Sequence, residues 1–294
     1  MRGEVERYLR DLWEDHASGE AVAETSGYGA LQNLLNAAGR ELNPTVRAIV
    51  NIKNRGAGIP DGGLFTADQL RRDGGGVEAG AGAAAGFPAQ LPARGAVEVK
   101  GVEDDVGEIV RGEQVDRYLG RYGQVLVTNY REFVLVGRDR AGQPVEIETF
   151  LLAENAAGFW SAAQAYRATA SEKGPGLVEF LKRSMLHGAP LSQPRDLAWF
   201  LASHAREALA LVEGAGSLPA LSEVREALRE ALGVAFEDES GEHFFRSTLV
   251  QTLFYGVFSA WVLWSKQRPY DSEEPFDWRI AAYILNVPMI RALF

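Results

Sequence analysis

The chain has 294 residues, 46% of them hydrophobic, which is enough for one large domain or two of ordinary size. It contains no cysteine, which excludes disulfide frameworks, thiolate metal sites and cysteine nucleophiles. The formal net charge of -10 argues against a protein that coats nucleic acid non-specifically, although it leaves room for a local basic groove. We expect a cytoplasmic location, because the cysteine-free composition fits a reducing compartment and the charged N-terminal stretch does not resemble a secretion signal.

The first half of the chain predicts mixed helices and strands. Apolar residues at helical spacing predict a helix over residues 2–17 and a second that begins near Ser26 and ends before Pro44. Three short strands are predicted next, in "TVRAIVNI", "GLF" and "AVEVKG". The glycine- and alanine-rich stretch 71–95, between the second and third strands, is predicted to be a flexible surface loop. A helix in "DVGEIVRGEQVDRYLGRYG", a hairpin in "QVLVTNYREFVLVGRD" and a strand in "VEIETFLL" complete this half.

The second half has helical periodicity throughout. The sequence therefore predicts an α/β domain over residues 1–152, with helices around a central mixed sheet, followed by an all-helical domain over residues 153–294. Residues 247–264 carry no charge and are nearly long enough to span a bilayer, so a membrane anchor is one interpretation. We favour a helix buried at the centre of a bundle, because Gln251 and several hydroxyl residues interrupt the apolar surface and no second span follows.

Two carboxylates and an ammonium are expected to meet at the predicted sheet. Glu98 and Lys100 stand two residues apart in "GAVEVKG" and so share one face of a strand, while Asp61 stands at the mouth of the preceding strand. Close carboxylates repel one another, and a hard divalent cation such as Mg2+ relieves the repulsion. Asp61, Glu98 and the backbone carbonyl of Val99 are the candidate metal ligands, and Lys100 is the candidate group that positions or activates a water.

This pattern resembles the PD-(D/E)xK nuclease superfamily, whose hallmark reads here as Pro60-Asp61 followed by Glu98-Val99-Lys100. The resemblance extends to both flanking helices. It implies a further acidic residue at the preceding helix, here Glu24, and a Gln-x-x-x-Tyr pair on the following helix. That pair is Gln114 and Tyr118. The interval from Asp61 to Glu98 is longer than in compact members, and the stretch 71–95 absorbs it at little entropic cost.

The fragments "IPDGGLF", "EVKG" and "QVDRYLGRYGQVLVTNYREFVLVG" are most similar to the N-terminal nuclease domains of bacterial restriction-modification polypeptides. In those proteins a helical connector, similar to "HFFRSTLVQTLFYGVFSAW", leads to an adenine N6-methyltransferase. The resemblance implies a restriction-endonuclease-like fold and a Mg2+-dependent DNA endonuclease, with Mn2+ as a substitute. It also implies double-stranded DNA as substrate, a role in phage defence, a methyltransferase or specificity module downstream, no membrane partner, and a dimer on DNA as a hypothesis.

Each signal also has a plainer interpretation. Glu98 and Lys100 can be a solvated cross-strand ion pair, Gln114 and Tyr118 a locally packed helix face, and Glu24 a partner of the helix dipole. The whole domain can be a catalytically silent nuclease-fold scaffold or DNA-binding module. Basic residues near the motif either line a phosphate-binding groove or are solvated surface charges: Lys53, Arg55, Arg111, Arg117, Arg121 and Arg131. Asn129 is predicted to satisfy a turn, and the four histidines are isolated.

Overall fold

The computed structural model describes residues 2–54, 56–70, 90–190, 193–214, 221–233, 236, 238–267 and 276–280. The chain divides into two units, Met1–Pro190 and Leu191–Phe294, which are described here one at a time. The predicted loop 71–95 lies mostly outside the described residues, as does Arg55. The sequence predicts a boundary at residue 152, whereas this division follows Pro190.

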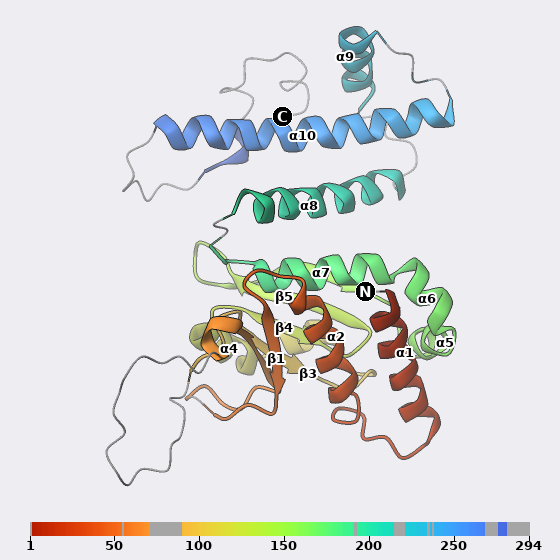
Figure 1. Cartoon of the computed structure of the whole chain (residues 1–294), viewed down its shortest axis with the longest axis vertical. Helices are drawn as coiled ribbons and strands as arrows, with labels where there is room; N and C mark the ends of the chain where they lie inside the picture. Colours follow the sequence, from red (N-terminus) through yellow and green to blue (C-terminus); the bar gives the residue numbers. More distant parts are fainter. Residues whose placement is uncertain are drawn as a thin grey trace. The chain divides into compact units, whose positions relative to one another are not determined.

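The first unit is built on a sheet with helices packed around it (Figure 1). The sheet has six strands, and each is hydrogen-bonded to the strands that precede and follow it in the chain. The strands are β1 (Val46–Val50), β2 (Gly62–Thr66), β3 (Ala96–Val99), β4 (Val125–Thr128), β5 (Glu132–Arg138) and β6 (Pro144–Leu151). Strands β3 and β4 are parallel, and every other neighbouring pair is antiparallel. The mixed α/β class and the six strands expected from the sequence are confirmed.

The parallel pair requires a crossover, and two helices supply it. They are α3 (Val106–Val110) and α4 (Glu113–Tyr122). The single helix predicted over this segment is therefore broken, because Gly112 adopts an extended ψ of 147° and caps α4. The chain changes direction at this break, and the second residue of α4, Gln114, contacts Glu98 of β3.

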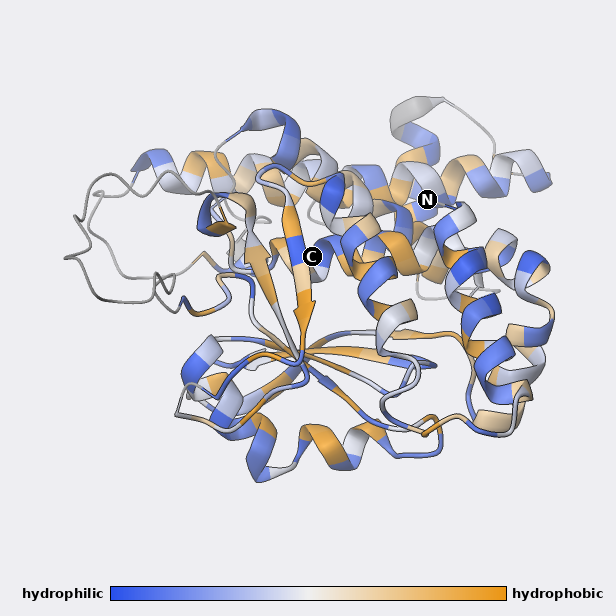
Figure 2. Cartoon of the chain, turned by 60° about the horizontal axis from the view of Figure 1, so that its bottom comes forward, coloured by the Kyte–Doolittle hydropathy of each residue, from blue (hydrophilic) through white to orange (hydrophobic). Residues whose placement is uncertain are grey.

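Alternation along β3 separates two apolar layers. Ala96 faces α3 and α4, where it joins a buried cluster with Val115, Leu119 and Val127. Glu98 shares that face by alternation and is itself buried. Figure 2 shows the hydrophobic colour along the strands and on parts of the surrounding helices. Apolar layers on both faces explain why all four residues of β3 are buried.

Five further helices complete the first unit: α1 (Arg2–Ala17), α2 (Tyr28–Arg40), α5 (Ala156–Gln164), α6 (Tyr166–Glu172) and α7 (Gly174–Leu186). The sequence predicts the last three in the helical domain, whereas in the structure α5 and α6 pack against α1 and α7 packs against β6. Arg183 of α7 pairs with Glu148 of β6, Lys182 pairs with Glu41, and the ring centroid of Phe180 lies 6.0 Å from that of Phe150 in a tilted arrangement. Helical periodicity reveals an apolar face but not the partner that covers it, so it does not by itself say which unit a helix joins.

Replacing Arg183 by Met tests this assignment of α7. The side chains of Arg183 and Glu148 are 4% and 15% exposed, and removing one partner of a buried pair costs about 3–5 kcal/mol. We expect the free energy of unfolding of the first unit to fall by about 3 kcal/mol in a urea titration. Arg167→Met, at a side chain that is 78% exposed, should change it by less than about 0.5 kcal/mol. Equal effects of both substitutions would contradict the docking of α7 on the sheet.

The described part of the second unit is helical, as predicted. It contains α8 (Pro194–Gly214), α9 (Ser222–Leu232), α10 (Glu239–Gln267) and a short 3-10 helix, η3 (Trp278–Ile280). A cavity of about 680 Å³ lies among apolar residues of α8, α10 and η3. The prediction that the apolar segment of α10 is buried at the centre of a bundle is wrong in part, because Tyr255 is 70% and Trp261 41% exposed. Among the described helices, none combines the length and the apolar character needed to cross a bilayer.

Candidate active site

Strand pairing brings Asp61 to the end of β3. Gly62 pairs with Val97 in the antiparallel β2–β3 ladder, so Asp61, one residue before β2, lies opposite Glu98 and beside Val99. The Asp61 Oδ2 atom accepts a hydrogen bond from the backbone N–H of Val99 at 2.8 Å. The backbone carbonyl of Asp61 accepts the N–H of Asn51 at 2.6 Å, which ties the same residue to the end of β1. Asp61 is therefore held by the backbone on both sides.

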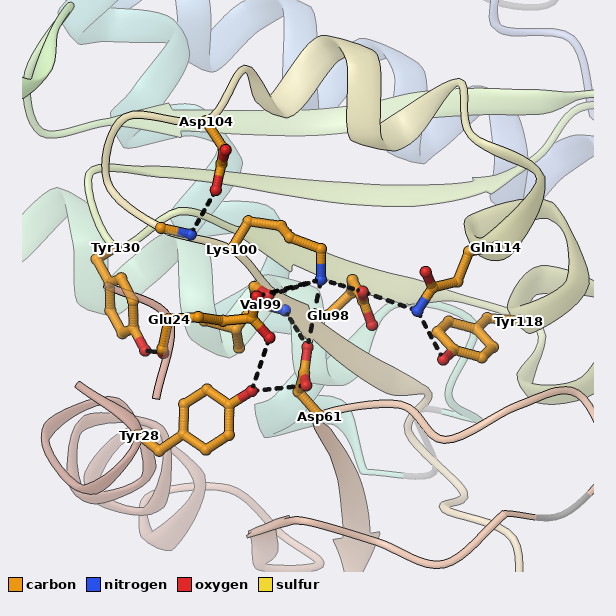
Figure 3. A network of polar contacts seen from close by, with 11 residues as sticks. Glu24, Tyr28, Asp61, Glu98, Val99, Lys100, Asp104, Gln114, Tyr118 and Tyr130 are labelled. Carbon is orange, nitrogen blue, oxygen red and sulfur yellow. Dashed lines mark hydrogen bonds and ion pairs between the residues drawn. The ribbon is translucent and has the colours of Figure 1, made fainter. Parts of the chain in front are cut away.

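The ammonium of Lys100 lies at the centre of the candidate site (Figure 3). Its Nζ atom donates to Glu98 Oε1 at 2.6 Å and to the carbonyl oxygen of Val99 at 3.0 Å. It also lies 3.9 Å from Asp61 Oδ2 and 4.0 Å from Glu24 Oε2. All three candidate metal ligands, together with Glu24, thus surround one positive charge.

Glu98 is the most buried charged residue of the site, at 1% exposure. Its Oε1 atom also accepts from Gln114 Nε2 at 2.9 Å, and the same amide nitrogen donates to the Tyr118 hydroxyl at 2.9 Å. The Oε2 atom of Glu98 is buried and has no hydrogen-bond partner in the described structure. Burial, reinforced by the charge of Asp61 and opposed by Lys100, raises the pKa of Glu98 to about 7.

The interpretation of Glu98 and Lys100 as a solvated pair is wrong. The ion pair of Glu98 and Lys100 is not a solvated cross-strand pair, since both residues belong to one strand segment and the carboxylate is buried. Glu24 does not lie in the first turn of a helix, because α2 begins at Tyr28. Glu24 instead stands in the preceding turn, with its carboxylate directed toward Lys100.

The oxygen atoms of the candidate site suit a divalent cation. The described residues contain no group of three or more His, Cys, Asp or Glu side chains arranged to hold a metal ion. A site for Mg2+ needs fewer, because Mg2+ usually keeps several waters and takes one or two carboxylates. Asp61, Glu98 and the Val99 carbonyl form such a set of oxygen ligands, and all three already surround the ammonium of Lys100. The Oε2 atom of Glu98, which is buried without a hydrogen-bond partner, is an oxygen that a metal ion could bind. The donor set fits the ion.

The basic residues divide into two groups. Arg131 is 9% exposed and donates to the carbonyls of Val102 and Glu154, both at 3.0 Å, so a role in a phosphate-binding groove is wrong for it. The other described members of the predicted groove are exposed: Lys53, Arg111, Arg117 and Arg121. The turn assigned to Asn129 is confirmed, because its Oδ1 accepts the N–H of Glu132 at 2.9 Å.

Sequence reasoning missed two tyrosines that contact the site. The Tyr28 hydroxyl donates to Asp61 Oδ1 at 2.6 Å, and the Tyr130 hydroxyl donates to the backbone carbonyl of Glu24. Tyr28 stands four residues after Glu24 at the start of a predicted helix, which is the one sequence signal that could have pointed to it. Tyr130 gave no such signal, since it lies in a turn and reaches the site only through the fold.

Comparisons with known proteins give one distant structural likeness and no match in sequence. No protein-family model matches the chain, and no curated protein matches it. A cryo-EM structure of a DrdV–DNA complex is similar to 57% of this chain and 97% of its own, with 18% sequence identity and a TM-score of 0.36. That likeness is too distant to assign the chain to a family.

Proposed function

We propose that the first unit is a Mg2+-dependent DNA endonuclease with a PD-(D/E)xK nuclease fold. The observation that carries the proposal is the convergence of Asp61, Glu98 and the Val99 carbonyl on one cation, the ammonium of Lys100, with Glu98 Oε2 buried and unpartnered. The register between strands β2 and β3 brings these residues together, and they follow one another along the chain in the order of the sequence motif.

Asp61, Glu98 and the Val99 carbonyl would hold the ion, which supplies Lewis-acid stabilisation of the phosphate and activation of water. Burial alone would lower the pKa of Lys100, but the hydrogen bond to Glu98 and the surrounding carboxylates outweigh it and raise that pKa. In the metal-free protein Lys100 is therefore an ammonium that donates. This state favours orienting a water and balancing charge on the phosphate over removing a proton.

The remaining residues support this arrangement. Gln114 holds Oε1 of Glu98, which leaves Oε2 as the free oxygen, and its bond to the Tyr118 hydroxyl fixes the amide. Glu24 adds a third carboxylate at the edge of the site, with its side chain 41% exposed. It extends the negative potential toward solvent, where a cation arrives.

The biological setting is proposed on the motif resemblance alone. It comprises double-stranded DNA as substrate, phage defence or restriction-modification as role, a methyltransferase or specificity module as a covalent neighbour, and a dimer on DNA. In this proposal the first unit cuts, and the helical second unit couples cutting to recognition.

Plasmid cleavage tests the proposal directly. We expect purified protein to nick or linearise supercoiled DNA with Mg2+ or Mn2+ and to be inactive in EDTA. Asp61→Ala removes a proposed ligand and should lower the rate at least about 100-fold, because the ion that it would help to hold stabilises negative charge in the transition state. Asp15→Ala, at an exposed carboxylate of α1, is the matched control and should cut like the wild type.

Two results would refute the nuclease. One is cutting that survives Asp61→Ala or EDTA. The other is a folded wild-type protein that binds Mn2+ and DNA but leaves the plasmid intact with and without a supplied recognition module. The second result would establish the silent DNA-binding scaffold instead.

A further inference from the structure

Three tyrosines link the helical layer to the candidate site. Tyr8 of α1 donates its hydroxyl to the backbone carbonyl of Tyr130 at 2.7 Å, in the turn between β4 and β5. The hydroxyl of Tyr130 donates in turn to the backbone carbonyl of Glu24. Tyr28, at the start of α2, then donates to Asp61 (Figure 3). The series runs from α1 through a turn of the sheet to a candidate metal ligand.

The middle member of the series has a strained backbone. Tyr130 has a φ of 71°, in the left-handed region that is costly for a residue with a side chain. Such a conformation persists only where its surroundings hold it. Here the Thr128 hydroxyl accepts the N–H of Tyr130 at 3.0 Å and Tyr8 holds its carbonyl, while the side chain is 1% exposed. These two hydrogen bonds hold the backbone of Tyr130, and burial holds its ring.

The ring of Tyr130 fixes the point where α2 begins. It lies so close to Gly27 that a Cβ atom there would stand 2.5 Å from the ring and 2.7 Å from the Leu12 side chain. Only a residue without a Cβ fits between them. Because Gly27 directly precedes Tyr28, the contact sets both the entry of the helix and the reach of the Tyr28 hydroxyl toward β2.

The Tyr28 hydroxyl has one proton and two carboxylate neighbours. It lies 2.6 Å from Asp61 Oδ1 and 3.4 Å from Glu24 Oε1, so its stronger hydrogen bond is the one donated to Asp61. The other oxygen of Asp61 accepts from Val99. Each oxygen thus accepts one hydrogen bond and retains a lone pair, and the plane of the carboxylate is fixed by two donors from different elements. Burial and the bond to Asp61 raise the pKa of Tyr28, which keeps the hydroxyl protonated.

We infer that Tyr28 is a positioning residue, which orients the Asp61 carboxylate for a divalent cation, and that Tyr130 positions Tyr28 and Glu24 for this task. The inference rests on the proposed metal-dependent function. It adds residues outside the motif, and it predicts that the hydroxyl of Tyr28 acts on cation affinity.

The test measures Mn2+ alone, by calorimetry with purified full-length protein. Tyr28→Phe deletes one hydroxyl and should weaken Mn2+ binding about tenfold, the effect of losing a hydrogen bond to a charged group. Tyr130→Phe should weaken it by a smaller factor, because Tyr130 acts through the backbone of Glu24. Tyr255→Phe, at an exposed tyrosine of α10, should bind as the wild type does. Urea unfolding of each variant separates a local effect from a loss of fold.

A second readout distinguishes positioning from general damage. Raising Mn2+ should restore the cleavage rate of Tyr28→Phe but not that of Asp61→Ala, since the first lacks only the support of a ligand. Wild-type affinity for Mn2+ in a folded Tyr28→Phe variant would overturn the inference and leave the nuclease intact. Wild-type protein that binds Mn2+ but never cuts would overturn the nuclease, while the weaker binding of Tyr28→Phe would still support the positioning role.

Discussion

Replacing Lys100 by Met should abolish DNA cleavage and, at the same time, tighten the binding of Mn2+ by at least about tenfold. The two effects have opposite signs because Lys100 has two roles in the proposed site. Its ammonium serves the reaction, yet in the metal-free protein it contacts Glu98, Val99 and, at 3.9 Å, Asp61, which are the three groups that would hold the ion. A metal ion has to displace it or share these oxygens with it.

The size of the expected gain follows from the charges. Two unit charges about 4 Å apart interact by about 4 kcal/mol at an effective dielectric constant near 20, and a tenfold change in affinity needs only about 1.4 kcal/mol. Loss of Lys100 also favours the protonated form of Glu98, so the titration belongs at pH 8.5. Calorimetry with Mn2+ on the wild type, Lys100→Met and the exposed control Lys266→Met checks the prediction. Weaker binding in Lys100→Met would show that the ammonium does not compete with the ion.

Replacing Glu98 by Gln should remove a pH dependence of stability and most of the metal affinity. The ordinary pKa of this carboxyl is 4.5, and burial raises it to about 7 in the folded protein. Between these pH values the folded state binds more protons than the unfolded state, so the free energy of unfolding falls as pH rises from 4.5 to 7. In EDTA the loss should be on the order of 2–3 kcal/mol and complete above pH 7.

Urea unfolding at pH 5, 6, 7 and 8 measures this loss as the difference between the wild type and Glu98→Gln. Because a glutamine side chain does not ionise, the stability of Glu98→Gln should not fall in this way between pH 4.5 and 7. The stability of Glu20→Gln, a substitution at an exposed position, should fall as that of the wild type does. Mn2+ should restore wild-type stability at pH 8, and its affinity should fall about tenfold per pH unit below 7, since one proton has to leave. Identical pH profiles for the wild type and Glu98→Gln would contradict the raised pKa.

Strand periodicity explains how much of the site the sequence could predict. The period of two puts Glu98 and Lys100 on one face of the strand. This prediction depends only on neighbouring residues of one strand and not on how distant elements pack. The spacing of Gln114 and Tyr118 places both on one helical face in the same way, and the two side chains are hydrogen-bonded. To predict that these residues converge, only the order of the strands and helices along the chain had to be correct.

Contacts that depend on packing between distant elements could not be predicted. The bond from Tyr28 to Asp61 spans 33 residues, and its existence depends on how α2 lies against β2. Arg131 looked like a surface base, but the β4–β5 turn buries it and its hydrogen bonds go to backbone carbonyls. The docking of α7 has the same origin, because an apolar helix face does not identify its partner.

The ladder between β2 and β3 has a consequence for how such chains diverge. It has two residue pairs, Gly62 with Val97 and Gly63 with Ala96, and glycine brings no side chain to define register. Alignment therefore relies on the bond from the Val99 N–H to Asp61 and on the backbone bonds that join Leu64 to Arg94 and Gly95. None of these anchors lies in the segment that joins Leu70 to Gln90, so insertions there leave the two carboxylates aligned at little entropic cost. A motif search with a fixed gap would miss relatives that a search on strand register would find.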